Sequence, residues 1–500
     1  MDDMDTKKKP KICYICGVKN TGKTTLMAAL IQELSVRSLN VAAIKHDGHD
    51  FTADTPETDT FRYDAAGAVE TAIYSQDQVM IHKRDSGDDD ESLIALFSDA
   101  DVILVEGCKE KPVRKIECLL TGVQEEPVSN REGRILLVCD EDLAGKADFM
   151  EPVLSSSDVS AIADRILADD PPENELIDPY GRRADYLRVS ITDRCNLRCA
   201  YCMPHGIEKV PMREILTYEQ IEEIVRAGAA LGIRKVKVTG GEPLVRKGCA
   251  TLIGMIRDIP GIEEVTLTTN GVYLKDQLPD LIDAGLSAVN VSLDTLSPEK
   301  FREITGTDAL GEVKEGIEAA LQSGLRVKVN CVLQRDVNDV EWPNIAMLAK
   351  NHKLDVRFIE MMPIGYGKEF DPISNAQLLV KMQAIWPDLI RDSNPHGNGP
   401  ALYYHIPGWE GSIGLISPIH GKFCGSCNRL RLTSTGKLKP CLCYGTAVDL
   451  RPILKEEDPA LREQDLQKAF REAVFLKPKE HCFEEKGKIT EKHKMSDIGG

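Results

Sequence analysis

The sequence predicts an α/β protein with two domains: a nucleotide-binding α/β domain and then a domain built on a parallel sheet or barrel, with a second group of cysteines near its C-terminus. Three observations support this fold class. A glycine-rich loop near the N-terminus joins an apolar run to a helical pattern. In the second part of the chain, apolar runs of strand length recur about every 25 to 40 residues, with helical patterns between them. The length of 500 residues also exceeds what one hydrophobic core normally organises.

Composition and charge describe an ordinary globular chain with an uneven charge distribution. No apolar run is long enough to cross a membrane, and the N-terminus lacks the apolar core of a signal peptide, so we expect a cytoplasmic protein. Residues 1–175 hold 19 Lys and Arg against 36 Asp and Glu, whereas residues 176–500 hold 43 against 44. This difference indicates two domains of separate origin, and neither has the basic balance of a nucleic-acid binder.

The first predicted domain, residues 1–170, begins with a phosphate-binding loop. An apolar strand, 12–16, leads into the sequence Gly-Val-Lys-Asn-Thr-Gly-Lys-Thr-Thr at 17–25, and a helical pattern follows to Leu34. In this P-loop pattern backbone N–H groups wrap phosphate oxygens, the lysine reaches the terminal phosphates and the following threonine binds Mg²⁺. A second buried strand, 101–106, ends in a carboxylate that is placed to act near the magnesium. The predicted site comprises Gly17, Gly22, Lys23, Thr24, Thr25 and Glu106.

A stiff connector separates the two predicted domains. A last helix over 159–168 is followed by Asp-Asp-Pro-Pro-Glu-Asn-Glu at 169–175. Paired prolines and carboxylates are typical of an extended, solvated linker. We therefore expect the second domain to cover residues 176–500.

Five strand-like runs of the second domain end in polar residues or glycines. They cover 235–239, 264–268, 288–292, 326–330 and 355–360. In parallel barrels the ligand lies at the C-terminal ends of the strands, so these tails should face one site. The tails include Gly240, Gly241 and Glu242, in addition to Thr268, Ser292, Lys328 and Arg357 with Met362 beyond it. Cations among them suit phosphate, and hydroxyls suit sugar and base.

The 15 cysteines of the chain cluster in two places, which favours metal ligation over a disulfide framework. Cys195, Cys199 and Cys202 follow the apolar run 187–191. Three thiolates at this spacing can hold an iron–sulfur cluster with one open position, or zinc with an additional ligand such as His205.

A second cysteine group follows near the C-terminus. Cys424, Cys427 and Cys441 lie on a predicted hairpin, with Cys443 close by. Spacing alone allows either a closed zinc site that uses Cys443 or a second cluster held by three cysteines.

Residues 10–168 resemble MobB, the GTP-binding adaptor family of molybdenum cofactor guanylation. The resemblance rests on the P-loop, the strand that ends at Glu106, the residues Asp54, Asp59 and Arg62, and the turn 65–68. It implies GTP with Mg²⁺ at the P-loop and a molybdenum cofactor guanylyltransferase as partner.

The second domain resembles the radical S-adenosylmethionine (SAM) enzymes in its first triplet and its Gly240–Gly241 pair. The second triplet, the adjacent Asn-Arg-Leu-Arg at 428–431 and the terminal Gly499 and Gly500 make residues 178–500 similar to the MoaA family, the GTP 3',8-cyclases of molybdenum cofactor biosynthesis. This second resemblance implies a radical SAM partial barrel with a cluster-binding region at about 370–500, and it favours a second 4Fe-4S cluster over zinc, leaving Cys443 spare.

The MoaA resemblance also implies roles for individual residues. Cys195, Cys199 and Cys202 would hold the SAM cluster, and Cys424, Cys427 and Cys441 the second. SAM contacts would come from Tyr201, Gly240, Gly241, Glu242, Ser292 and Met362. GTP would be faced by Arg188, Lys237, Thr268, Lys328, Arg357, Arg429 and Arg431, and the tail Gly499–Gly500 would reach into the active site. At Lys237 the family is expected to have arginine, so this contact keeps the charge but not the planar fork.

The implied activity is radical cyclisation of GTP to (8S)-3',8-cyclo-7,8-dihydroguanosine 5'-triphosphate, an early step of molybdopterin formation. SAM, two 4Fe-4S clusters and an electron donor would be needed. The partners implied are the downstream cyclic pyranopterin monophosphate synthase and a second copy of the chain in a homodimer. Two alternatives stay open on the residues alone: a radical SAM enzyme that acts on a peptide or another small molecule, and a non-catalytic GTP-binding adaptor with structural metal.

Overall fold

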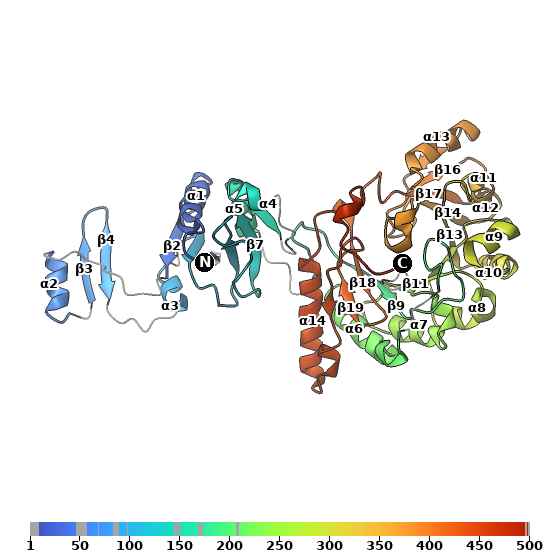
Figure 1. Cartoon of the computed structure of the whole chain (residues 1–500). Coiled ribbons are helices and arrows are strands. Elements are labelled where there is room, and N and C mark those ends of the chain that lie inside the picture. The colour runs from blue at the N-terminus through green and yellow to red at the C-terminus, as the bar shows by residue number, and fades with distance from the viewer. Residues whose placement is uncertain are drawn as a thin grey trace, which may run out of the picture. The chain divides into compact units, whose positions relative to one another are not determined.

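The structure is a computed structural model that describes residues 10–46, 58–68, 70–83, 90–97, 99–144, 149, 152–168, 174–206, 210–495 and 498. The chain divides into two compact units, Met1–Asp170 and Pro171–Gly500. Figure 1 shows both units, and each is described by itself below.

A six-stranded parallel sheet of order β2-β5-β1-β6-β7-β8 forms the centre of the first unit. Its central strands are nearly free of exposed side chains, because helices and loops cover both faces. The strands are β1 (Lys11–Cys16), β2 (Val41–Lys45), β5 (Val102–Glu106), β6 (Lys115–Cys118), β7 (Arg134–Cys139) and β8 (Val153–Ser155).

Short helices and a separate hairpin complete the first unit. Helix α1 (Lys23–Val36) begins directly after Gly22, whose φ of 83° lies in the left-handed region that glycine tolerates. α1 packs on α5 (Val159–Leu167), and both contribute to the core beside β1. The other elements are α2 (Asp59–Ala65), α3 (Asp90–Ala95), α4 (Glu141–Ala144) and the antiparallel pair β3 (Glu70–Tyr74) and β4 (Val79–Lys83).

The second unit contains an open twelve-stranded sheet of order β15-β16-β17-β14-β13-β12-β11-β10-β9-β18-β19-β20. Its middle is a run of parallel strands in reverse sequence order, as expected of a partial (β/α) barrel. These strands are β9 (Tyr186–Ser190), β10 (Lys235–Thr239), β11 (Glu264–Thr269), β12 (Ala288–Ser292), β13 (Arg326–Val332) and β14 (Leu354–Ile359). The α/β fold class predicted from the sequence is confirmed.

Additional strands extend both ends of this sheet. β17 (Ser412–Ile416) runs parallel to β14 and carries the antiparallel β16 (Leu402–His405) and β15 (Ile390–Asp392). At the other end β18 (Arg429–Leu432) runs parallel to β9, followed by the antiparallel β19 (Lys437–Lys439) and β20 (Val448–Asp449). The hairpin of β18 and β19 brings the second cysteine group beside the strand that leads into the first.

Helices cover the outer face of the curved sheet, as Figure 1 shows for α6 to α12. α6 begins with a capping box, in which the Thr217 side chain accepts from Gln220 N–H and the Gln220 side chain accepts from Thr217 N–H. The helices are α6 (Tyr218–Ala230), α7 (Cys249–Arg257), α8 (Leu274–Asp283), α9 (Pro298–Thr305), α10 (Leu310–Gln322), α11 (Trp342–Ala346), α12 (Leu348–Asn351), α13 (Asn375–Ile385) and α14 (Pro459–Phe475). None of the helices in the described part of the chain has the length and apolar character to span a bilayer.

The alternation of side chains along the barrel strands separates the core from the interior of the barrel. On β10, Val236 and Val238 are fully buried in the large apolar core, while Lys237 between them points the other way and lines a cavity. This alternation places polar side chains inside the barrel along the length of the strands as well as at their ends.

Candidate active site

One cavity of about 370 Å³ inside the second unit is lined by both cysteine groups. Cys195, Cys199 and Cys202 contribute from the loop after β9. Cys424, Cys427 and Cys441 contribute from the segments that flank β18 and β19. Within the described residues, no three His, Cys, Asp or Glu side chains converge as the ligands of a single metal ion would. The thiols of both triplets instead line the same cavity. Thiolates are the donors that iron–sulfur clusters use.

Backbone contacts and burial fix the first triplet. Leu197 N–H donates to Cys195 Sγ at 3.4 Å, and Asn270 Nδ2 lies 3.9 Å from the same sulfur. Burial raises the pKa of the Cys195 thiol to about 11. A buried thiol of this kind stays protonated in the free chain, so a bound cation must displace the proton.

Gly240 and Gly241 let the backbone after β10 lie against the cysteine loop. Gly241 N–H donates to Thr192 O at 2.7 Å, and a Cβ on Gly241 would lie only 2.4 Å from Arg194 O. Only glycine fits such an approach, which explains the pair physically. Both glycines also line the cavity.

The Glu242 side chain ties the end of β11 to this glycine pair. Its carboxylate accepts from Thr269 Oγ1 at 2.7 Å, from Asn270 N at 2.6 Å and from Leu244 N at 3.0 Å. Burial nevertheless raises the pKa of Glu242 to about 7. Its hydrogen bonds make Glu242 an organiser of the strand ends as well as a lining residue.

Other predicted SAM contacts line the same cavity. Tyr201, Ser292 and Met362 all do so. The Tyr201 hydroxyl donates to Asp294 Oδ2 at 2.8 Å, which fixes the ring beside Cys199 and Cys202. Burial raises the pKa of Asp294 to about 6.

A layer of cations lies deeper in the cavity, on neighbouring strands. Arg188 is the register partner of Lys237 on β10 and of Arg431 on β18. Arg357 and Arg429 line the same space, as does Thr268. Burial and the neighbouring Arg357, Arg188 and Lys328 hold the pKa of Lys237 well below its ordinary value. Among the described residues Lys237 makes no ion pair, so a group of cations shares this space and an anionic ligand would relieve their repulsion.

Two predicted cations do not lie where the sequence placed them. Lys328 and Arg357 were expected at the C-terminal strand ends, but they are the third residue of β13 and the fourth of β14. Because alternate side chains of a barrel strand point inward, a mid-strand residue also reaches the interior. Arg357 does line the cavity, and its Nε donates to Asn330 Oδ1 at 2.8 Å.

Lys328 does not line the cavity. Its ammonium pairs with Asp355 Oδ2 at 3.0 Å and donates to Tyr403 Oη at 3.0 Å and to His396 O. These three contacts use all three N–H donors of a lysine, so Lys328 ties the loop before β16 to the barrel wall in this state.

The second triplet is supported by two residues that the sequence analysis missed. Lys477, just after α14, is 3% exposed and lies 3.6 Å from Cys427 Sγ. Burial alone would raise the pKa of Cys427, but Lys477 and Arg429 hold it below its ordinary value. His481 N–H donates to Cys424 Sγ at 3.4 Å. No motif marks either residue, because their roles arise only when the C-terminal segment folds back on β18.

Cys443, which the resemblance left spare, is absent from the cavity lining. It is fully buried, and its Sγ lies 3.4 Å from Cys482 Sγ. Gly499, Gly500 and Asp54 lie outside the described residues.

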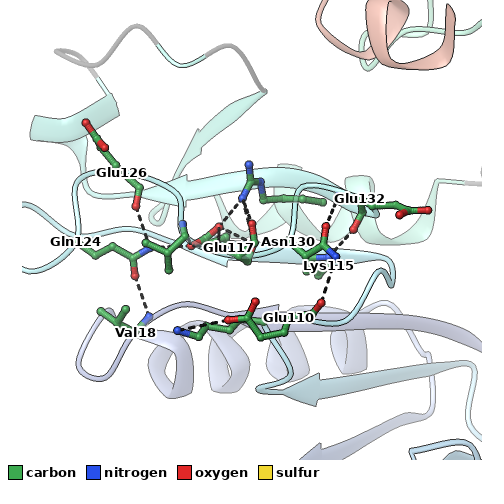
Figure 2. A network of polar contacts seen from close by, with 12 residues as sticks. Val18, Glu110, Lys115, Glu117, Gln124, Glu126, Asn130 and Glu132 are labelled. Atoms are coloured by element: carbon green, nitrogen blue, oxygen red, sulfur yellow. Dashed lines mark hydrogen bonds and ion pairs between the residues drawn. The ribbon is translucent and has the colours of Figure 1, made fainter. Parts of the chain in front are cut away.

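In the first unit the predicted phosphate-binding residues lie at the end of β1 and the start of α1. Lys23 Nζ donates to Val18 O at 2.6 Å, and Thr24 Oγ1 donates to Glu106 Oε2 at 3.1 Å. Gly17 has a φ of 136°, and a Cβ there would lie 2.6 Å from Cys118 O. Gly22 precedes the helix and Thr25 is exposed in its first turn. Figure 2 shows that a buried polar network around Glu117 reaches this loop through Gln124 and Val18.

Comparisons with known proteins decide between the alternatives. Three family models match: Molybdopterin guanine dinucleotide synthesis protein B over residues 12–141, Radical SAM superfamily over 189–349, and Molybdenum Cofactor Synthesis C over 354–483. A GTP 3',8-cyclase of Heliobacterium modesticaldum is 44% identical over 330 residues, which is 65% of this chain and 100% of that protein. The chain belongs to the GTP 3',8-cyclase family. A relative of the same name in Clostridium perfringens is 41% identical over 324 residues, which is 65% of this chain and 99% of the relative.

The family membership covers the second unit, and a MobB domain precedes it, so the predicted fusion is confirmed. Among solved structures, Bacillus subtilis MobB is similar to 32% of this chain and 99% of its own, at 24% identity and a TM-score of 0.28. Streptococcus suis SuiB bound to S-adenosylmethionine is similar over 61% of this chain and 74% of its own, at 15% identity and a TM-score of 0.41.

Proposed function

We propose that this chain cyclises GTP to (8S)-3',8-cyclo-7,8-dihydroguanosine 5'-triphosphate by radical SAM chemistry, and that its first unit is a GTP-binding adaptor. The observation that carries the proposal is the single cavity that joins two cysteine triplets through a layer of cations. A nucleoside triphosphate has a base, a sugar and an anionic triphosphate, and different groups of side chains in this cavity suit each of these parts.

Cys195, Cys199 and Cys202 would hold an iron–sulfur cluster, which together with bound SAM would supply the radical chemistry that removes hydrogen from the substrate. The chain's own residues orient the cofactor. The backbone of Gly240 and Gly241 contacts the SAM amino acid portion, while Tyr201, Glu242, Ser292 and Met362 line its site. Burial of these groups keeps water from a reactive centre.

The cation layer binds the triphosphate of GTP. Arg188, Lys237 and Arg431 stand side by side on three strands, and Arg357 and Arg429 complete the group. Phosphate oxygens replace the mutual repulsion of these cations with charge-assisted hydrogen bonds. Thr268 contacts the nucleoside, and Lys328 joins the phosphates only by giving up one of its present contacts.

Cys424, Cys427 and Cys441 would hold a second 4Fe-4S cluster, which would bind the guanine base. Lys477 and His481 support this proposal, because a cation and an N–H donor beside two of the sulfurs stabilise the thiolate form that ligates metal. Arg429 and Arg431 lie two and four residues after Cys427, so they can hold both the nucleotide and the Gly499–Gly500 tail.

The first unit binds GTP with Mg²⁺ at its P-loop. Thr24 and Glu106 already share a hydrogen bond at 3.1 Å, a separation at which both oxygens can serve one Mg²⁺ shell directly or through water. Within molybdenum cofactor biosynthesis the expected partners are an electron donor, the downstream cyclic pyranopterin monophosphate synthase and a molybdenum cofactor guanylyltransferase. We also propose that the chain works in the cytoplasm and forms a homodimer.

Anaerobic reconstitution of the full chain tests this proposal. Iron and sulfide should reach the content of two 4Fe-4S clusters per chain, and Cys424→Ala should retain one cluster. Given SAM, a reductant and GTP, the wild-type chain should consume GTP. Unchanged GTP with both clusters present would support a radical SAM enzyme for another substrate, and a colourless zinc-loaded chain would support the non-catalytic adaptor.

A further inference from the structure

The backbone of Val18 in the P-loop is held at both its carbonyl oxygen and its N–H. Its carbonyl oxygen accepts from Lys23 Nζ at 2.6 Å and from Thr21 Oγ1 at 3.0 Å. Its N–H donates to Gln124 Oε1 at 2.8 Å, across 106 residues of sequence. Lys23 and Thr21 belong to the P-loop motif itself, so Gln124 anchors the Val18 backbone from outside the motif.

The Gln124 amide can face Val18 in one orientation only. Its Nε2 donates to Glu117 Oε1 at 2.7 Å and to Glu126 O at 3.0 Å. Both partners are acceptors, so the NH₂ end must face them, and the oxygen end must face the Val18 N–H. Gln124 is 7% exposed, so water does not readily replace either contact.

Glu117 fixes the position of Gln124 in turn. This fully buried carboxylate also accepts from Val128 N at 2.8 Å, from Ser129 Oγ at 2.6 Å and from Arg134 Nη1 at 2.8 Å. Burial alone would raise the pKa of Glu117, but the hydrogen bonds from Ser129, Val128 and Gln124 hold it below its ordinary value. Glu117 is therefore a charged acceptor at neutral pH, and Figure 2 shows the chain of contacts from it through Gln124 to Val18.

We propose that Gln124 is a positioning residue of the nucleotide site, which holds the P-loop in its phosphate-binding shape before GTP arrives. This inference rests on the proposed binding of GTP by the first unit. When the terminal phosphates attract the Lys23 ammonium, the Val18 carbonyl loses that contact, and Gln124 still holds the N–H of the same residue. A loop that is already shaped loses less conformational entropy on binding, so its affinity is higher.

Gln124→Met tests the proposal, because methionine keeps the volume and loses the hydrogen bonds. Glu117 retains its bonds to Val128, Ser129 and Arg134, so the unit should fold. Loss of one such hydrogen bond should weaken GTP binding about three- to tenfold. Binding is measured by calorimetric titration of the full chain with GTP and Mg²⁺ in the absence of SAM. The component that disappears in Lys23→Ala is assigned to the P-loop.

Thr121→Val is the matched control. Thr121 lies in the same loop as Gln124, and its Oγ1 donates to Asp140 at 2.7 Å. The substitution removes this hydrogen bond and leaves Gln124 in place. The inference predicts unchanged P-loop affinity in Thr121→Val and reduced affinity in Gln124→Met, with similar thermal unfolding of the two variants by circular dichroism.

The outcomes separate the inference from its premise. If Lys23→Ala removes no binding component, the proposed P-loop function fails. If Lys23→Ala removes a component that Gln124→Met leaves at full affinity, Gln124 does not position the loop. Equal weakening by Gln124→Met and Thr121→Val would also overturn the inference, because it would show only general loosening of loop 120–129.

Discussion

Arg188 on β9 and Arg431 on β18 are register partners on adjacent parallel strands. Lys237 is the partner of Arg188 on its other side, so three cations stand in a row across β18, β9 and β10. The row begins four residues after Cys427, a ligand of the proposed second cluster, and continues into the barrel. Through this pairing the C-terminal hairpin completes the cation layer inside the barrel.

Loss of Arg431 should mainly weaken substrate binding. Arg431→Met removes one guanidinium from the row and keeps most of the side-chain volume, so the KM for GTP should rise roughly 10- to 100-fold, the usual cost of a hydrogen bond to a charged group. Steady-state GTP consumption measures this effect. Lys437→Met on the neighbouring strand, where the side chain is exposed, should leave KM unchanged. Equal KM values for the two variants would show that Arg431 does not contribute to GTP binding.

Lys237→Met should stabilise the substrate-free chain and at the same time weaken its binding of GTP. Lys237 is a buried cation among cations, so its removal should raise the free energy of unfolding of the substrate-free chain by about 1 kcal/mol or more. The same variant should bind GTP at least about tenfold more weakly. All three tryptophans, Trp342, Trp386 and Trp409, lie in the second unit, so urea unfolding followed by tryptophan fluorescence reports on that unit alone. A destabilised Lys237→Met chain would contradict the electrostatic account of the layer.

The second cluster should depend on Lys477. In Lys477→Met the ammonium near Cys427 Sγ is lost, so the thiolate is less stable and the cluster should leave the chain faster. Iron per chain after a defined time with a chelator measures the loss. Lys479→Met, whose side chain is exposed two residues away, is the control and should match the wild type. Identical iron release from Lys477→Met and the wild type would show that Lys477 has no role in cluster retention.

Stability of the cofactor-free second unit should fall as the pH rises from about 4.5 to about 7. The folded chain raises the pKa of Glu242 from 4.5 to about 7, so the folded state binds this proton more tightly than the unfolded state. The stabilisation is complete below pH 4.5 and is lost as the pH rises through about 7, by roughly 3 kcal/mol in all.

Glu242→Gln should remove its own part of this pH dependence, because glutamine does not titrate. Asp294, whose pKa burial raises from 3.8 to about 6, contributes a change of similar size at lower pH, which Asp294→Asn should remove. Urea unfolding at several pH values, followed by tryptophan fluorescence, measures both effects. A slope in Glu242→Gln as steep as in the wild type would show that another group titrates.

The sequence predicted the strands and their polar tails because apolar runs and glycines are local signals. It did not predict the depth of the cation layer. The pattern Lys235-Val-Lys-Val at β10 is consistent with a strand that has one apolar and one solvated face, whereas Lys237 in fact faces the barrel interior. Closure of the sheet decides which face is inside, and closure depends on contacts between distant strands.

The sequence also did not predict which groups bind the individual charged side chains. Lys328 was predicted to face GTP because it was expected at a strand end and because the MoaA resemblance implied this role. In the folded chain Asp355, Tyr403 and the His396 carbonyl bind its ammonium, and two of these lie beyond β14 in the chain. Lys477 and His481 reach the second triplet only after α14 returns the chain to β18.

Transfer of hydrogen from GTP tests the central claim most directly. The reconstituted full chain is given SAM, a reductant and GTP that carries deuterium at C3', and the 5'-deoxyadenosine formed is analysed by mass spectrometry. The account predicts one deuterium in 5'-deoxyadenosine, together with loss of GTP and formation of the 3',8-cyclised nucleotide. Unlabelled 5'-deoxyadenosine with GTP unconsumed would contradict it.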